Sequence, residues 1–151
     1  MLKNIIPPPV YALLIATLMY SLAKYLPILT LFEPPINQLA YLFVVIGITF
    51  DLSSLILFIR SKTTSNPIKP ANASKLVITG LYRYSRNPMY AGLFFLLLAW
   101  AWYMGALSPF IGLPLFVMVI TIQQIQPEEQ ALESKFGQAY LDYKKKVRRW
   151  I

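Results

Sequence analysis

Two arginines and three tyrosines precede an apolar run in the segment 80–92, G-L-Y-R-Y-S-R-N-P-M-Y-A-G. Guanidinium groups bind carboxylates through charge-assisted hydrogen bonds, and tyrosine rings stack on flat ligands or face cations. The segment could therefore hold a polar ligand at the edge of an apolar region. A structural role is equally open, because Asn87 is a good N-cap and Pro88 suits the first position of a helix.

A second polar group follows the last apolar run, where Glu128 and Glu129 come directly after Pro127. Carboxylates can accept hydrogen bonds from hydroxyl or amino groups of a ligand. Acids after a helix-opening proline also suit the helix dipole, so a structural role is again open. Apolar side chains then recur at steps of three and four, which predicts one amphipathic interfacial helix over 127–147. These positions are Leu132, Phe136, Tyr140, Tyr143, Val147 and Trp150.

Two missing residue types exclude several kinds of site. The chain has no histidine and no cysteine, so it cannot build a His or Cys metal site, a Cys nucleophile, a Ser-His relay or a disulfide. It has only six acidic residues. We therefore expect no metal, and an enzyme of this composition would depend on a cofactor for its reactive group.

Composition places these groups in a membrane protein. Hydrophobic residues make up 57% of the chain, charged residues only 13%, and the mean hydropathy is +0.55. A soluble domain of this composition would expose too much apolar surface. We predict an all-α integral membrane protein with a single domain over 1–151. The net charge of +8 is carried by residues that flank apolar runs, so we expect membrane lipids as partners and no nucleic acid.

About four transmembrane helices are expected, followed by the interfacial helix. The predicted spans are 9–26, 36–59, 89–104 and 107–125. The third is shorter than the roughly 20 residues of a full span, so it needs either a local adjustment such as tilt or a helical hairpin with the fourth, and both alternatives are open. Pro109 and Pro114 predict a bend in that fourth helix. Basic residues gather in the loop 60–88 and in the tail, so the positive-inside rule places this loop and both termini in the cytoplasm.

Asp51 is the one acidic residue inside a predicted span. A carboxylate within the membrane is a functional hypothesis by default. The alternative is that the helix breaks there and Asp51 caps a short interfacial helix. Both remain open, and the loop from Arg60 to Pro70 could be either a lid or a solvated connection.

Taken in order, the two polar groups resemble the isoprenylcysteine carboxyl methyltransferase family. The resemblance rests on G-x-Y-R-x-x-R-N-P-x-Y-x-G, a short apolar hairpin, and E-E-x-x-L-x-x-x-F-G-x-x-Y-x-x-Y-x-x-x-V-x-R, and it covers about 76–149. The wider group also includes phospholipid N-methyltransferases. The resemblance implies a membrane-embedded enzyme that uses S-adenosyl-L-methionine to methylate a lipophilic or prenylated acceptor at the cytoplasmic side.

The resemblance also implies which residues form the site. Arg86 and Glu129 are expected to carry the activity. The candidates for cofactor binding are Tyr82, Arg83, Arg86, Asn87, Pro88, Tyr90, Gly92, Glu128 and Glu129. Tyr140 and Tyr143 are possible lining residues. Alignment of acceptor, methyl group and sulfur is the main task of such a site, so a carboxylate acceptor needs no strong base, whereas an amine acceptor would need Glu129 or a tyrosine.

Two departures from the family pattern bear on the substrate. Asn87 stands where many members have histidine, which keeps hydrogen bonding and removes a titratable group. Upstream of the acidic pair, the eukaryotic enzymes have basic residues, whereas this chain has Thr121, Gln123, Gln124 and Gln126. A cation for the carboxylate of a prenylcysteine is therefore missing at these positions, which argues against prenylcysteine as the substrate.

Three alternatives stand beside the carboxyl methyltransferase. One is a phospholipid N-methyltransferase. Another is an NADPH-dependent membrane reductase, because the sterol reductases resemble these enzymes in their C-terminal half. The last is a small membrane protein without catalysis, in which the arginines only set the topology.

Overall fold

The structure, a computed structural model, describes residues 6–30, 37–61 and 75–151. Among these residues it is all-helical, which confirms the all-α part of the predicted class. The longer helices are α1 (Pro8–Tyr25), α2 (Asn37–Arg60), α3 (Pro88–Met104), α4 (Gly112–Ile120), α5 (Gln126–Phe136) and α6 (Gln138–Lys146). Short 3₁₀ turns precede α3 (η2, Gly80–Arg83) and α4 (η3, Ser108–Ile111), and a π turn (η4, Thr121–Ile125) joins α4 to α5.

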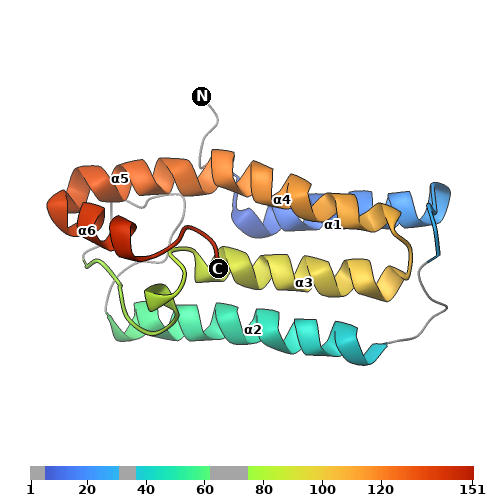
Figure 1. The fold of residues 1–151 in the computed structure, drawn as a ribbon, viewed down its shortest axis with the longest axis horizontal. Coiled ribbons are helices and arrows are strands. Elements are labelled where there is room, and N and C mark those ends of the chain that lie inside the picture. The colour runs from blue at the N-terminus through green and yellow to red at the C-terminus, as the bar shows by residue number, and fades with distance from the viewer. Residues whose placement is uncertain (1–5, 31–36, 62–74) are drawn as a thin grey trace.

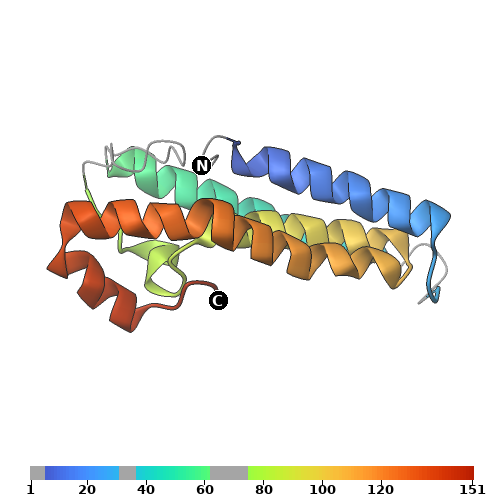
Figure 2. The same cartoon turned by 90° about the horizontal axis from the view of Figure 1, so that it is seen from above.

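The helices form an elongated bundle in which α3 is central. Figure 1 shows α2 along one side of α3 and the rod of α4 and α5 along the other. Figure 2, seen from above, shows α1 running beside this rod. Buried apolar side chains of α1, α3 and α4 form the core, among them Met19, Leu97, Phe116 and Ile120. This packing fixes α3 and the rod relative to each other, and the candidate site lies at one end of both.

The hairpin of α3 and α4 turns at Gly105. This residue has φ 69° and ends α3 in the left-handed conformation, which costs glycine little. The 3₁₀ turn Ser108–Ile111 follows at once, with Pro109 in it, and Pro114 lies in the first turn of α4. The turn therefore sends the chain back along α3.

Pro109 and Pro114 predicted a bend near their own positions in the fourth helix. The irregular part of this helix lies further along the chain. It is the π turn Thr121–Ile125, where the Gln126 N–H donates to the Thr121 carbonyl, five residues back. Pro127 has no N–H for the helical ladder, so a local change of register just before it is expected. The helix thus continues through Pro127, and the prediction that Pro127 opens a separate helix was wrong.

The tail is also not the single helix predicted over 127–147. It breaks at Gly137, which has φ 53° and ψ −126°, a conformation that side chains on Cβ disfavour. After this break α6 folds back beside α5 (Figure 1). The periodic side chains therefore do not share one helical face, and Tyr140 and Tyr143 are buried against the protein.

By length and composition, two of the described helices could cross a membrane. They are Gln38–Arg60 and the continuous rod Ser108–Phe136, whereas α3 is shorter. Large apolar side chains stay exposed on α1 and α2, including Leu13, Leu14, Val45 and Ile59. Such outward apolar surfaces suit lipid surroundings. Four crossings and the side of the termini stay predictions, and residues 62–74 of the predicted loop lie outside the described residues.

Candidate functional site

The arginine-tyrosine segment leads directly into α3. Tyr82 is buried in the turn η2, and α3 begins at Pro88 as predicted. Asn87 occupies the N-cap position, but its side chain makes no capping hydrogen bond. Its Nδ2 instead donates to the Arg149 carbonyl at 2.9 Å. The capping role predicted for the Asn87 side chain was therefore wrong: its oxygen accepts no N–H of the first turn, and its amide is oriented by the bond to the Arg149 carbonyl.

That carbonyl belongs to the end of the chain, which returns to lie beside residues 85–87. Ser85 and Arg148 form an isolated parallel bridge, and the Arg86 N–H donates to the Arg148 carbonyl at 2.9 Å. Trp150 Nε1 donates to Thr121 Oγ1 at 3.3 Å, and its ring packs on the core. The C-terminus accordingly lies near the start of α3 in Figure 1. The tail thus covers the segment that the sequence singled out.

Glu129 joins two arginines at the centre of this arrangement. Its Oε1 accepts from Arg86 Nη2 at 2.7 Å and from Arg149 Nε at 3.0 Å, and its Oε2 accepts from Arg149 Nη2 at 2.7 Å. The side chains of Arg86 and Glu129 are 9% and 8% exposed. The hydrogen bond to Glu129 raises the pKa of Arg149 above its usual value. The cluster is a charge-assisted network with both carboxylate oxygens in use.

Glu128 makes a separate contact with α3. Tyr90 donates its hydroxyl hydrogen to Glu128 Oε1 at 2.5 Å. No described residue donates to Glu128 Oε2. The sequence predicted ligand roles for both acids, and in the structure Glu128 is the one that keeps an acceptor free. Through these contacts the two acids join α5 to Tyr90 and Arg86, which lie 38 and 43 positions earlier in the chain.

Aromatic side chains close the site on the side of α6. The Tyr143 hydroxyl donates to the Tyr82 carbonyl at 2.7 Å, and the Tyr82 ring meets Phe58 of α2 edge-on. Tyr140 is fully buried, with its ring beside that of Tyr143. Burial raises the pKa of Tyr82 and of Tyr143, which keeps both hydroxyls protonated. These tyrosines therefore line the site as neutral groups.

Asp51 faces the same helix start from α2. The helix is continuous from Asn37 to Arg60, so the interpretation of Asp51 as the cap of a broken helix was wrong. A Cβ on Gly92 would overlap the Asp51 carboxylate, and a Cβ on Gly47 would lie 2.9 Å from the Gly92 carbonyl oxygen. The absence of a side chain at Gly92 thus makes room for Asp51.

The structure does not bring every predicted residue into the cluster. Arg83 is exposed at the end of η2, and no contact joins it to the acidic pair. Pro88 is buried at the start of α3 and sets the helix there. The sequence did not predict that Arg149 and the carbonyls of residues 144 and 147–149 belong to the site. The arginine forms the last letter of the quoted tail pattern, but nothing in the sequence shows that it returns to Glu129.

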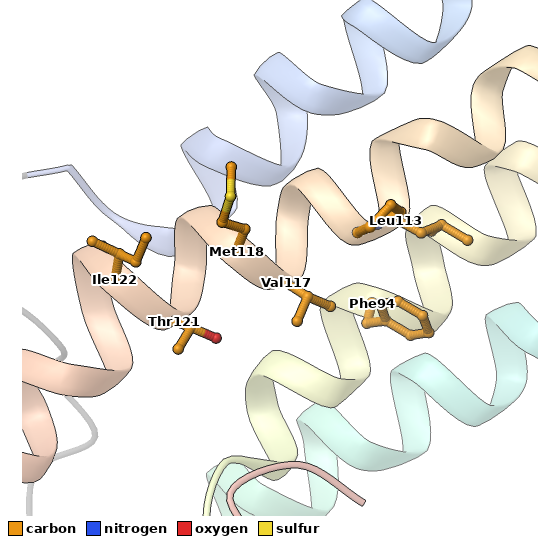
Figure 3. Close-up of a pocket in the computed structure, with 7 residues that line it drawn as sticks. Phe94, Leu113, Val117, Met118, Thr121 and Ile122 are labelled. Atoms are coloured by element: carbon orange, nitrogen blue, oxygen red, sulfur yellow. The ribbon is translucent and has the colours of Figure 1, made fainter.

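An apolar groove runs between α3 and α4 towards this end of the molecule. It has a volume of about 540 Å³ and is lined by Phe94, Leu113, Pro114, Val117, Met118, Thr121 and Ile122. Figure 3 shows Phe94 on α3 opposite Val117 and Leu113. Thr121 at its far end is also the partner of Trp150, so the groove adjoins the residues that cover the site.

Comparison with known proteins decides the family. The model of the phospholipid methyltransferase family matches residues 36–139. The chain belongs to this family. The match spans α2, α3, the rod and the acidic pair, and it ends before Tyr140 and Arg149. This confirms the resemblance drawn from the two motifs.

Two relatives show how far the likeness extends. An uncharacterized protein of Haemophilus influenzae is 48% identical over 63 residues, which is 42% of this chain and all of that protein. Protein-S-isoprenylcysteine O-methyltransferase of Schizosaccharomyces pombe is 39% identical over 78 residues, 48% of this chain and 30% of that enzyme. This chain therefore matches less than a third of the yeast enzyme. No solved structure matches it significantly.

Proposed function

We propose that this protein transfers a methyl group from S-adenosyl-L-methionine to a lipophilic acceptor at the cytoplasmic side of a membrane. Membership of the phospholipid methyltransferase family supports the reaction class. The observation that carries the proposal is the pairing of the two motifs, in which Arg86 meets Glu129 and Tyr90 meets Glu128. An arginine segment that served only topology would not need buried contacts with distant acids.

The groups present fit this cofactor. Arg86 and Arg149 share one carboxylate, so the cluster keeps a net positive charge that suits the carboxylate of the cofactor. The buried Nε of Arg86 has no hydrogen-bond partner among the described residues. Glu128 Oε2 can accept from an amino group or a ribose hydroxyl, and tyrosine rings favour a sulfonium. When bound, S-adenosyl-L-methionine supplies a methyl group on an electrophilic sulfur.

The residues of the chain would then align the acceptor and exclude water. The hydrocarbon part of the acceptor suits the apolar groove of α3 and α4, which has only Thr121 as a polar lining residue. Its reactive end would lie towards the covering tail. The buried Tyr82, Tyr140 and Tyr143 would keep water from one side of the polar cluster. Positioning of this kind can supply much of the rate enhancement of a displacement.

The acceptor atom decides whether a base is needed. A carboxylate acceptor arrives without a proton to lose. An amine acceptor must release a proton, and Glu128 Oε2 is better placed than Glu129 to take it, because Glu129 is held by two arginines. This free acceptor oxygen and the family match favour phospholipid N-methylation as a second candidate.

Ligand binding tests the proposal directly. Purified protein would be titrated by calorimetry with S-adenosyl-L-methionine, S-adenosylhomocysteine and NADPH. We expect the first two to bind, and Glu128→Gln to weaken both about 10- to 100-fold, since a charged hydrogen bond is worth roughly 1.5–3 kcal/mol. Glu133→Gln is the matched control, because Glu133 is 42% exposed and pairs with Lys144. Binding of NADPH alone would favour a reductase and contradict the proposal.

The acceptor requires its own assay. Protein and radiolabelled cofactor would be incubated with phosphatidylethanolamine or with a farnesylcysteine derivative in mixed micelles. Label in the phospholipid would support N-methylation, and label in the prenylated compound would support carboxyl methylation. No transfer to either, or to a total lipid extract, would contradict methylation of a lipophilic acceptor.

A further inference from the structure

Arg149 differs from Arg86 in how much of its guanidinium is available. Nε and Nη2 of Arg149 donate to Glu129, whereas Nη1 donates to no described residue. Its side chain is 37% exposed, against 9% for Arg86. A guanidinium held by one edge on a carboxylate keeps its other edge free for a second anion. Arg149 therefore has both the charge and the access that binding of an anion requires.

Arg86 is used in a different way. Its Nη1 donates to the carbonyls of Lys144 and Val147 at 2.9 and 3.2 Å, and its Nη2 donates to Glu129. These bonds tie α3 to the end of α6 and to α5. Only the buried Nε is left without a partner. Arg86 thus holds the site together and offers a ligand little of its charge.

The charges around Arg149 leave it positive towards a ligand. Among the described residues Glu129 is its acidic partner, and it is shared with Arg86. The other acids of the tail contact other groups, Glu133 with Lys144, Asp142 with Lys145, and Glu128 with the Tyr90 hydroxyl. Asn87, whose amide holds the Arg149 carbonyl, fixes the backbone at this position. The free edge of Arg149 is accordingly held in place by both its side chain and its main chain.

We propose that Arg149 binds the anionic group of the ligand, while Arg86 is a positioning residue. This inference rests on the proposed function. It assigns a binding role within that site to Arg149, which lies outside the residues that the family model matches. The anion is either the carboxylate of the cofactor or the phosphate of a phospholipid acceptor. Both are recognised by a guanidinium edge, and the two sources can be separated by paired ligands.

The experiment compares Arg149→Ala and Arg149→Lys with Arg148→Ala. Arg148 is the matched control, because it is exposed, next in sequence, and contributes only its backbone carbonyl to the site. Calorimetry would measure the affinity for two pairs of ligands. The first pair is S-adenosylhomocysteine and 5′-methylthioadenosine, which lacks the carboxylate. The second pair is dihexanoyl phosphatidylethanolamine and dihexanoylglycerol, which lacks the phosphate. Thermal unfolding of each variant would monitor the fold.

We expect Arg149→Ala to weaken one charged ligand by about 10- to 100-fold, the usual size for a charge-assisted hydrogen bond, and to leave its uncharged counterpart unchanged. Selective loss of S-adenosylhomocysteine would identify the cofactor carboxylate, and selective loss of the phospholipid would identify the acceptor phosphate. Arg149→Lys should restore part of the affinity because it keeps the charge.

Two results would overturn the inference while leaving the proposed function intact. One is an equal loss for the charged and uncharged members of both pairs, since a structural role predicts that pattern. The other is binding by Arg149→Ala that matches Arg148→Ala. If the wild-type protein bound neither S-adenosylhomocysteine nor the phospholipid, the proposed function and this inference would both fail.

Discussion

At the scale of single residues, Glu129 is the link on which the site depends. It is buried, and its two oxygens form ion pairs with two arginines from different parts of the chain. A buried ion pair contributes little over an apolar replacement, but removing one partner leaves the other charge unpaired. The importance of Glu129 therefore lies in the unpaired arginine charge that its removal would leave in the buried cluster.

Glu129→Gln should destabilise the protein markedly. We expect about 3–5 kcal/mol, because Arg86 would remain buried without a counter-charge. Glu133→Gln should cost at most about 1 kcal/mol, since the pair of Glu133 and Lys144 is largely exposed. Thermal and denaturant unfolding in detergent would measure both. Equal stability of the two variants would show that the Arg86 charge finds water or another partner.

Gly92 sets the distance between α2 and α3. Gly92→Ala should cost about 1–3 kcal/mol, as is usual for overpacking, because its new methyl group would overlap the Asp51 carboxylate. Asp51→Ala in the same chain should recover part of this loss by removing the obstacle. A double-mutant cycle of unfolding free energies would measure the coupling. Additive effects would contradict the contact of Gly92 with Asp51.

At the scale of elements, the turn at Gly137 decides where the tail goes. Its backbone has φ 53° and no atom lies near the position of a Cβ, so only backbone strain opposes a side chain there. Because of this break α6 folds back, and Arg149 reaches Glu129. A straight helix through residue 137 would carry the tail away from α3.

Gly137→Ala should therefore loosen the tail. We expect a loss of about 1–3 kcal/mol, the cost of this positive-φ conformation for a residue with a Cβ. Faster proteolysis after the lysines and arginines between positions 144 and 149 should accompany it. Ser134→Ala, on an exposed position of α5, is the control and should change neither quantity. Unchanged proteolysis of Gly137→Ala would mean that the strain is relieved without moving α6.

At the scale of the whole molecule, the site lies at one end of an elongated apolar bundle. The turn near Gly105 lies at the other end (Figure 1). The acidic pair, the two arginines and most of the tail lysines all gather at the first end. This asymmetry suits a protein whose polar end faces one side of a membrane.

The predicted orientation can be tested by cysteine labelling, because the natural chain has no cysteine. Lys145→Cys and Leu107→Cys place single thiols on exposed residues at opposite ends. In inside-out vesicles an impermeant maleimide should label the first and spare the second, and intact cells should give the reverse. Labelling of both from one side would contradict a bundle that crosses the membrane with a cytoplasmic tail.

The helical class, the two motifs and the family could all be predicted from the amino-acid sequence. Apolar runs specify helices through local composition, and residues such as Pro88 and Gly105 mark helix ends through their own backbone preferences. Motif order needs no knowledge of the fold. These properties depend on neighbours in the chain, so they can be read without the tertiary structure.

The contacts between polar groups, in contrast, became known from the three-dimensional fold. Asn87 was expected to cap α3, yet it binds the Arg149 carbonyl 62 residues later, and Pro127 was expected to open a helix, yet a π turn carries the helix through it. Glu129 proved to be enclosed, whereas Glu128 keeps an oxygen free. Such outcomes depend on long-range packing and on the competition of distant donors and acceptors, which no local pattern in the sequence contains.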